Sequence, residues 1–160
     1  MIHPATLASD LMTTKLVTLS PGCDVFSAID LLLKNRISGA PVVNQAGDFL
    51  GVFSERSAME VVVNALYDGM PDAGLMPFVD TNPPTITPDT DLLTICQTFL
   101  DQATRRLPVL EGRRLLGQIS RRDVMRVASR LQKTEQSYHA ELLYLSAIND
   151  DSSVVINRLS

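Results

Sequence analysis

The sequence contains no tryptophan, and aromatic residues make up only 5% of it. Because hydrophobic residues reach 45%, a core must be built mainly from aliphatic side chains. Histidine and cysteine are scarce too, with His3, His139, Cys23 and Cys96 as the full set. None of the four lies at metal-ligand or redox spacing or beside a nucleophile signature, and no Walker or Rossmann glycine-rich loop is present. The sequence therefore predicts no catalytic or metal site, and we expect Cys96 to be a small core residue.

Long apolar runs and excess positive charge are also missing. No apolar run approaches the ~20 residues that a membrane-spanning helix needs. The first five residues lack a basic region followed by an apolar stretch, so no signal peptide is predicted. The net charge of −4 and the pI of about 5.0 argue against a nucleic-acid surface. We therefore expect a cytoplasmic protein with no nucleic-acid partner and no membrane insertion, whose 160 residues form one core or two small lobes.

What the chain does contain is a long internal repeat. Two pairs of segments carry it: Val17–Val25 with Pro84–Leu92, and Ala40–Val43 with Leu107–Leu110. The offset is 67 residues between Pro21 and Pro88, and 66 between Gly51 and Gly117. Two copies of a unit this long favour two similar halves about a pseudo-two-fold axis over a solenoid. Facing halves leave a cleft, which is where small ligands bind.

Each copy is predicted to run strand, helix, strand, strand, helix. In the first copy we expect a strand at Leu16–Leu19 and a helix that begins near Asp24. A hairpin of Pro41–Val43 with Phe49–Ser54 should follow, and then a second helix that ends at Gly69. Gly51 and Gly117 fall inside the third strand of their copies, where glycine often marks a bulge or a close approach by another group. The expected division is 7–69 for the first repeat, 70–83 for a connector, 84–131 for the second repeat and 132–160 for a C-terminal helix and tail.

Two segments lie outside the repeat. Leu7–Met12 is predicted to form a short helix that packs against the pair. Thr134–Ile148 is predicted to be a helix with Tyr138, Leu142 and Leu145 along one face. That face is expected to pack either on the lobes or on a second copy of the chain. No structure is assigned to the polar tail that follows.

Together these segments resemble a tandem pair of CBS domains, the cystathionine-β-synthase-type regulatory modules, over residues 7–131. The specific parts are Asp10–Thr13, Gly39–Val43, Gly51–Ser54 and Gly117–Ser120. The resemblance implies an α/β (α+β) fold of two β-α-β-β-α units, here followed by a C-terminal helix. It also implies clefts that bind AMP, ADP, ATP or S-adenosylmethionine, a role in sensing (energy sensing included), and dimerisation. We expect a stand-alone regulatory module, a homodimer that requires no cofactor and acts on a regulated protein of unknown identity.

The resemblance assigns ligand-binding roles in the second repeat. Ser120 and Asp123 match the family's Ser/Thr-x-x-Asp motif, in which the hydroxyl faces the phosphates and the carboxylate accepts hydrogen bonds from the ribose. The same four residues also match a capping box, which would begin any helix. In the first repeat Ser54 is retained but Ser57 replaces the aspartate, so that site is expected to be weak, altered or empty. One competent site per chain is expected.

Two further groups are expected at that site. The resemblance places a base-binding wall of small residues and exposed backbone beside Asp123, made of Ile37, Ser38, Gly39, Leu19 and Ser20. Arg105 and Arg106 occupy the matching turn of the second repeat, and Arg106 is expected near the phosphates with Arg122 flanking the cleft. The alternatives are a simple turn at Ser38–Gly39 and a solvated arginine pair.

Two functions therefore remain open from the sequence. One is a sensor that binds an adenosine-containing ligand between the repeats. The other is a ligand-free dimerisation or protein-interaction module whose nucleotide sites have degenerated, as Ser57 suggests. Catalysis is not expected.

Overall fold

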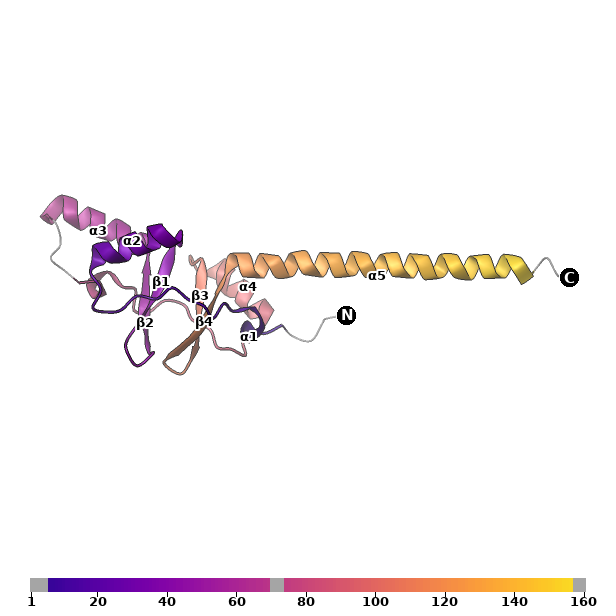
Figure 1. Ribbon diagram of the computed structural model, residues 1–160, viewed down its shortest axis with the longest axis horizontal. Helices are drawn as coiled ribbons and strands as arrows, with labels where there is room; N and C mark the ends of the chain where they lie inside the picture. The colour runs from indigo at the N-terminus through magenta and orange to yellow at the C-terminus, as the bar shows by residue number, and fades with distance from the viewer. Residues whose placement is uncertain (1–5, 70–73, 157–160) are drawn as a thin grey trace. The chain divides into compact units, whose positions relative to one another are not determined.

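The computed structural model describes residues 6–69 and 74–156, with side chains described up to residue 148 (Figure 1). It divides into two units, Met1–Arg121 and Arg122–Ser160, each described by itself. The first unit holds both repeats, and the second is a helix. Among the helices described, none combines the length and the apolarity that crossing a membrane requires.

The first repeat contains the elements that the sequence predicts after its first strand. These are α2 (Val25–Asn35), β1 (Gly39–Val43), β2 (Phe49–Ser54) and α3 (Glu55–Asp68). Helix α2 begins where Asp24 accepts a hydrogen bond from the backbone N–H of Ser27 at 3.0 Å, and it ends at Arg36 in the left-handed conformation. The predicted strand at Leu16–Leu19 is reduced to one parallel bridge, from Leu19 to β1. The turn that follows Leu19 takes the chain away from the sheet, which limits the pairing to that residue.

The second repeat reproduces this arrangement. It contains α4 (Leu92–Asp101), β3 (Arg106–Glu111) and β4 (Arg114–Ser120), and α5 (Arg121–Ile156) follows. Asp91 caps α4 as Asp24 caps α2, by accepting from the backbone N–H of Thr94 at 3.0 Å. Each hairpin is an antiparallel pair, β1 with β2 and β3 with β4, and each carries a register shift at the same point of the repeat. The two hairpins are joined where the N–H of Phe49 donates to the carbonyl of Arg113 at 2.8 Å.

The core beneath the hairpins is mainly aliphatic, as the composition predicts. Residues with no exposed surface come from both repeats and include Val25, Val42, Val61, Ile95, Leu107, Val109 and Ile119. Three phenylalanines, Phe53, Phe78 and Phe99, complete it. Cys96 is half-buried on α4, and both cysteines are free thiols.

The segment that precedes each repeat pairs with the other repeat. Thr13 pairs with β4, since its N–H donates to the carbonyl of Gln118 at 2.9 Å and its carbonyl accepts from the N–H of Gln118 at 3.1 Å. Asp80 pairs with β2 in the same way, exchanging two hydrogen bonds of 2.9 and 3.0 Å with Val52. Two more bridges follow the same rule, Leu7 with Asp91 and Gly74 with Asp24. The short helix α1 (Ala8–Leu11) and the 3-10 turn η1 (Met76–Phe78) lie on these exchanged segments, so the repeats are interlocked rather than joined by a passive connector.

The exchange explains the glycine in the third strand of each repeat. A Cβ at Gly51, whose φ is +151°, would lie 2.6 Å from Val79 Cγ1 and overlap the carbonyl of Asp80. A Cβ at Gly117 would lie 2.8 Å from the carbonyl of Thr13. The prediction that these glycines mark a bulge or a close approach is confirmed, because both occur at each position.

Helix α5 differs from the expectation of two separate helices. It is one helix of 36 residues from Arg121 to Ile156, and it runs through the predicted boundary near Leu131 and into the predicted tail. No glycine or proline occurs between these two ends, so no residue in the sequence breaks the helix.

Candidate functional site

The first unit contains a cleft of about 730 Å³ to which both repeats contribute. The first repeat supplies the start of β1, the end of β2 and the first turn of α3. The second repeat supplies the turn before β3. The exchanged segment around Asp80 closes a third side, so the interlocking of the repeats also builds this cavity. Its size is in the usual range for small-molecule sites.

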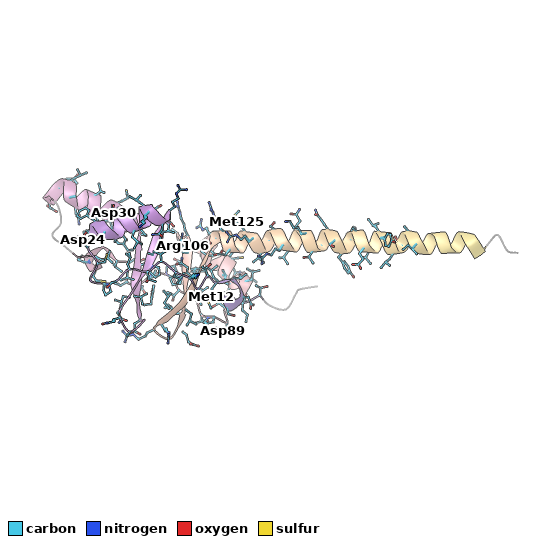
Figure 2. All side chains as sticks on the ribbon, viewed as in Figure 1. Met12, Asp24, Asp30, Asp89, Arg106 and Met125 are labelled. Carbon is cyan, nitrogen blue, oxygen red and sulfur yellow. The ribbon has the colours of Figure 1, made fainter. Side chains whose placement is uncertain are left out.

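Two arginines from the second repeat line this cleft. Arg106 begins β3 and is half-buried, and its position is labelled in Figure 2. The hydroxyl of Thr104 holds the turn by donating to the carbonyl of Arg106 at 2.7 Å and accepting from its N–H at 3.4 Å. Arg105 reaches the first repeat, where its guanidinium lies 3.7 Å from the carboxylate of Glu55. Both side chains are more than half exposed, so this ion pair is weak and can give way to a stronger anion.

The N-terminus of α3 forms another part of the wall. The hydroxyl of Ser54 accepts from the N–H of Ser57 at 3.3 Å, and the hydroxyl of Ser57 accepts from the N–H of Ser54 at 3.1 Å. Ser57 is 5% exposed, so it is a buried capping residue here. The N–H of Glu55 donates to the carbonyl of Ser38 at 2.9 Å, which fixes the entry to β1 against the same helix end. A helix N-terminus carries partial positive charge, and this one opens onto the side of the cleft that the arginines line.

The remaining surface combines apolar side chains with one ordered carboxylate. Pro77, Val79 and Pro84 supply the apolar part. Asp80 lies beside them, and its carboxylate accepts from the backbone N–H of Asn82 at 3.0 Å. An apolar wall with a few placed polar groups is the usual lining of a small-molecule site.

Four of the predicted ligand-binding residues line this cleft: Ser38, Gly39, Arg105 and Arg106. Three others lie elsewhere in the first repeat. Leu19 is a core residue, 3% exposed, and Ile37 packs against the same core. Ser20 is exposed in the turn before α2. The structure therefore combines the arginine pair with the serine motif of the first repeat, the copy that lacks the aspartate.

The rest of the predicted site belongs to the second repeat's own motif. Ser120 ends β4 and lies opposite Arg106 in the strand pairing. Asp123 and Arg122 are in the first turn of α5, in the second unit. There the carboxylate of Asp123 accepts from the guanidinium of Arg126 at 2.8 Å. This i, i+3 contact offsets the charge of the carboxylate along the helix.

The sequence analysis did not identify Asp80, Asn82 or Thr104 as lining residues. Asp80 and Asn82 reach the cleft through the exchange of segments, which no local pattern marks. Thr104 had a usable signal, since it directly precedes the two arginines in a turn and its hydroxyl can bond to that turn.

Comparison with known proteins identifies the family. A family model described as the CBS domain matches residues 8–64 and 77–130. The chain belongs to the CBS domain family. As a CBS pair it is similar in structure to the CBS-pair protein CBSX2 of Arabidopsis thaliana, with a TM-score of 0.72 and 22% identity over 81% of this chain and 99% of that one. It is also similar to CBSX2 in complex with AMP, with a TM-score of 0.71 and 24% identity over 79% and 98%. The CBS domain pair of protein MJ0100, in complex with 5′-methylthioadenosine and S-adenosyl-L-methionine, gives a TM-score of 0.67 at 18% identity over 79% and 98%. The α+β CBS fold with a C-terminal helix is thereby confirmed.

Curated relatives contain this CBS pair as part of longer chains. An A-adding tRNA nucleotidyltransferase of Geobacter sulfurreducens is 29% identical over 126 residues, which is 79% of this chain and 14% of the enzyme. An uncharacterized protein of Methanocaldococcus jannaschii is 27% identical over 74% of this chain and 41% of its own. The CBS pair thus spans less than half the length of either relative.

Proposed function

We propose that this chain is a regulatory module that binds an adenosine-containing ligand between its two CBS repeats. The observation that carries the proposal is the cleft itself, in which Arg105 and Arg106 of one repeat line the same cavity as the N-terminus of α3 from the other. Structures of similar fold bind AMP in one case, and 5′-methylthioadenosine with S-adenosyl-L-methionine in another. AMP, ADP, ATP and S-adenosylmethionine are the ligands to test.

The charge arrangement supports a phosphate or carboxylate group on the ligand. Arginine engages two oxygens of an anion with its planar fork, and a helix N-terminus adds its dipole. Arg105 is already paired with Glu55, and an anionic group entering the cleft would compete with that carboxylate. The ion pair joins the two repeats, so a ligand that displaces it would change a contact between them. Such a change offers a way to transmit the bound state.

The adenosine part has support from the apolar wall and from the sequence motif. Pro77, Val79 and Pro84 offer a surface on which a base can pack, next to exposed backbone at Ser38 and Gly39. Ser57 lacks the carboxylate that would accept from two ribose hydroxyls, and its own hydroxyl is used in the cap. The Ser120-x-x-Asp123 motif is not among the residues that line this cleft, and its role as the ribose partner stays a prediction from the sequence.

We also propose that the module is a homodimer in the cytoplasm that signals to a regulated protein and does not itself catalyse a reaction. Nucleotidyl transfer is the named activity of the Geobacter relative, and the alignment covers 14% of that enzyme. Within the described residues no three histidine, cysteine, aspartate or glutamate side chains gather as a metal site would require. A sensing role accounts for the cleft without a catalysed reaction.

Thermal unfolding with each of the four ligands tests this proposal. A ligand present at 100 times its dissociation constant stabilises the folded state by about 2.7 kcal/mol if it binds only that state. We expect at least one of the four to raise Tm by several degrees, and Arg105→Ala with Arg106→Ala, both in the lining of the cleft, to remove the gain. Arg113→Ala, exposed and outside the cleft, is the matched control and should keep the gain. Absence of a shift with all four ligands would contradict the proposal.

A specific observation favours a second function. The hydroxyl of Ser57 is engaged in capping α3, at the position where the family motif has the aspartate whose carboxylate would accept from the ribose. If the second motif is equally inactive, the chain is a dimerisation or protein-interaction module with degenerate sites. An unchanged Tm with all ligands, combined with a stable dimer, would support this function instead.

A further inference from the structure

Helix α5 carries an exposed apolar stripe for which the described structure offers no cover. Every residue from Ala128 to Ile148 is exposed. The exposed fractions are 47% for Leu131, 64% for Tyr138, 47% for Leu142 and 52% for Leu145. A helix whose residues are exposed on every side from 128 to 148 has little to stabilise it there, because most helical stability in proteins comes from burying an apolar face.

The spacing of the stripe is that of a coiled coil. Leu131, Tyr138 and Leu145 are seven residues apart, and Leu142 lies between the last two at four and three residues. This alternation keeps one seam facing a partner helix over several turns. Glu135 stands at the remaining seam position, and a single polar residue there specifies alignment at a cost in stability. The pattern therefore fits another helix as the partner better than it fits a flat surface.

The charges along α5 are divided between its two halves. Residues 121–133 carry five cationic side chains and one anionic one, while residues 134–156 carry four anionic side chains and no lysine or arginine. This order opposes the helix's own dipole, which favours acidic residues at the N-terminus and basic ones at the C-terminus. The division therefore has no explanation in a solitary helix.

A second copy of the same helix, running in the opposite direction, satisfies both features. We infer that α5 pairs antiparallel with α5 of another copy of this chain, with the basic half of each helix lying along the acidic half of the other. The stripe of Leu131, Tyr138, Leu142 and Leu145 forms the seam. In a parallel pair like charges would face each other along the whole length, which is destabilising. This inference rests on the proposal that the chain forms a homodimer. It adds to that proposal which surface forms the interface and in which direction the two helices run.

Seam variants of the full chain test the interface. Leu142→Asp with Leu145→Asp should halve the mass of the assembly in analytical ultracentrifugation, because it places charges in the seam. Leu143→Asp with Tyr144→Asp is the matched control. It adds the same charges at the neighbouring exposed positions of the same turn, off the seam, and should leave the mass unchanged. An assembly that persists in the seam variant would overturn the inference and leave α3, with its exposed Met59, Val63 and Leu66, as the surface to examine for the proposed dimer.

Charge reversal gives a readout that does not alter the seam. Arg126→Glu with Arg130→Glu, both off the seam, should raise the dimer dissociation constant about tenfold, since two basic side chains per helix that face the acidic half of the partner become acidic. The dissociation constant of the unaltered protein should also rise with salt. A dissociation constant that falls with salt would indicate like charges in contact and would overturn the antiparallel direction.

The direction can be measured by pulsed electron–electron spin resonance. A single label is placed by Met125→Cys in a chain that also carries Cys23→Ser and Cys96→Ala. With 1.5 Å of rise per residue and the seam centred near Tyr138, an antiparallel pair separates the labels by roughly 40 Å. Side-by-side parallel helices, ~8–10 Å apart, would hold them within about 20 Å. A distance near 40 Å is expected. The short distance overturns the inference while leaving the dimer proposal intact, and a monomeric unaltered protein overturns both.

Discussion

Replacing Gly51 with alanine tests whether the repeats are interlocked as described. The glycine lies in β2 at a φ of +151°, a conformation that residues with a side chain rarely adopt. The new Cβ would come within 2.6 Å of Val79 Cγ1 and would overlap the carbonyl of Asp80. Asp80 belongs to the exchanged segment that pairs with Val52, so that segment cannot remain in place without a shift of one backbone against the other.

The magnitude follows from two separate costs. Forcing an extra methyl group against a packed neighbour costs about 1–3 kcal/mol. Holding a side-chain-bearing residue in a region of φ and ψ that glycine alone populates costs about the same again. A loss of about 3 kcal/mol in the free energy of unfolding corresponds to a fall of about 10 °C in Tm for a unit of this size. Gly117→Ala should cost less, because its Cβ would meet the carbonyl of Thr13 at 2.8 Å but no positive φ adds to it.

Differential scanning calorimetry of three variants measures this order. Gly22→Ala is the control, since a Cβ there meets nothing within 4 Å and the backbone is not in the positive-φ region. We expect Tm to fall most for Gly51→Ala, less for Gly117→Ala and hardly at all for Gly22→Ala. Equal values of Tm for Gly51→Ala and Gly22→Ala would refute the exchange of segments between the repeats.

Three further outcomes are expected. Arg106→Ala should weaken AMP binding about tenfold in a calorimetric titration, whereas Arg113→Ala, exposed and outside the cleft, should not change it. The backbone N–H and hydroxyl of Thr94 hold the pKa of Asp91 below its usual value of 3.8. The stability that this carboxylate adds is therefore present above pH 3.8 and is lost as the pH falls below it. In acid unfolding, the stability of Asp91→Asn should depend less steeply on pH in that range. Asp24→Ala should lower the free energy of unfolding by about 1 kcal/mol, because it removes the cap of α2. Asp30, labelled with Asp24 in Figure 2, is the control, and an equal loss of stability in Asp30→Ala would contradict this explanation.

The repeated pattern predicted most of the elements because it records local requirements twice. Asp24 and Asp91 cap equivalent helices, and the glycines at 51 and 117 mark equivalent close approaches. Because the two repeats keep this pattern with different residues, the pattern reflects a shared structure rather than a coincidence of sequence. The strand expected at Leu16–Leu19 was too long, since strand propensity gives no information on how many partners a segment finds.

The partners of the exchanged segments could not be predicted from the sequence. Nothing in Thr13 or Asp80 specifies which repeat each one joins, because pairing is a property of the assembled sheet. The cleft likewise combines Arg106 with Ser54 and Ser57, a combination that the sequence did not predict. A motif identifies which groups can bind a ligand, and the fold decides which of them share a cavity.

Isothermal titration of AMP into the purified protein tests the central claim most directly. A saturable heat of binding is expected, which the same titration into Arg105→Ala with Arg106→Ala should lack. Absence of heat up to millimolar AMP, repeated with ATP and S-adenosylmethionine, would contradict an adenosine-binding module.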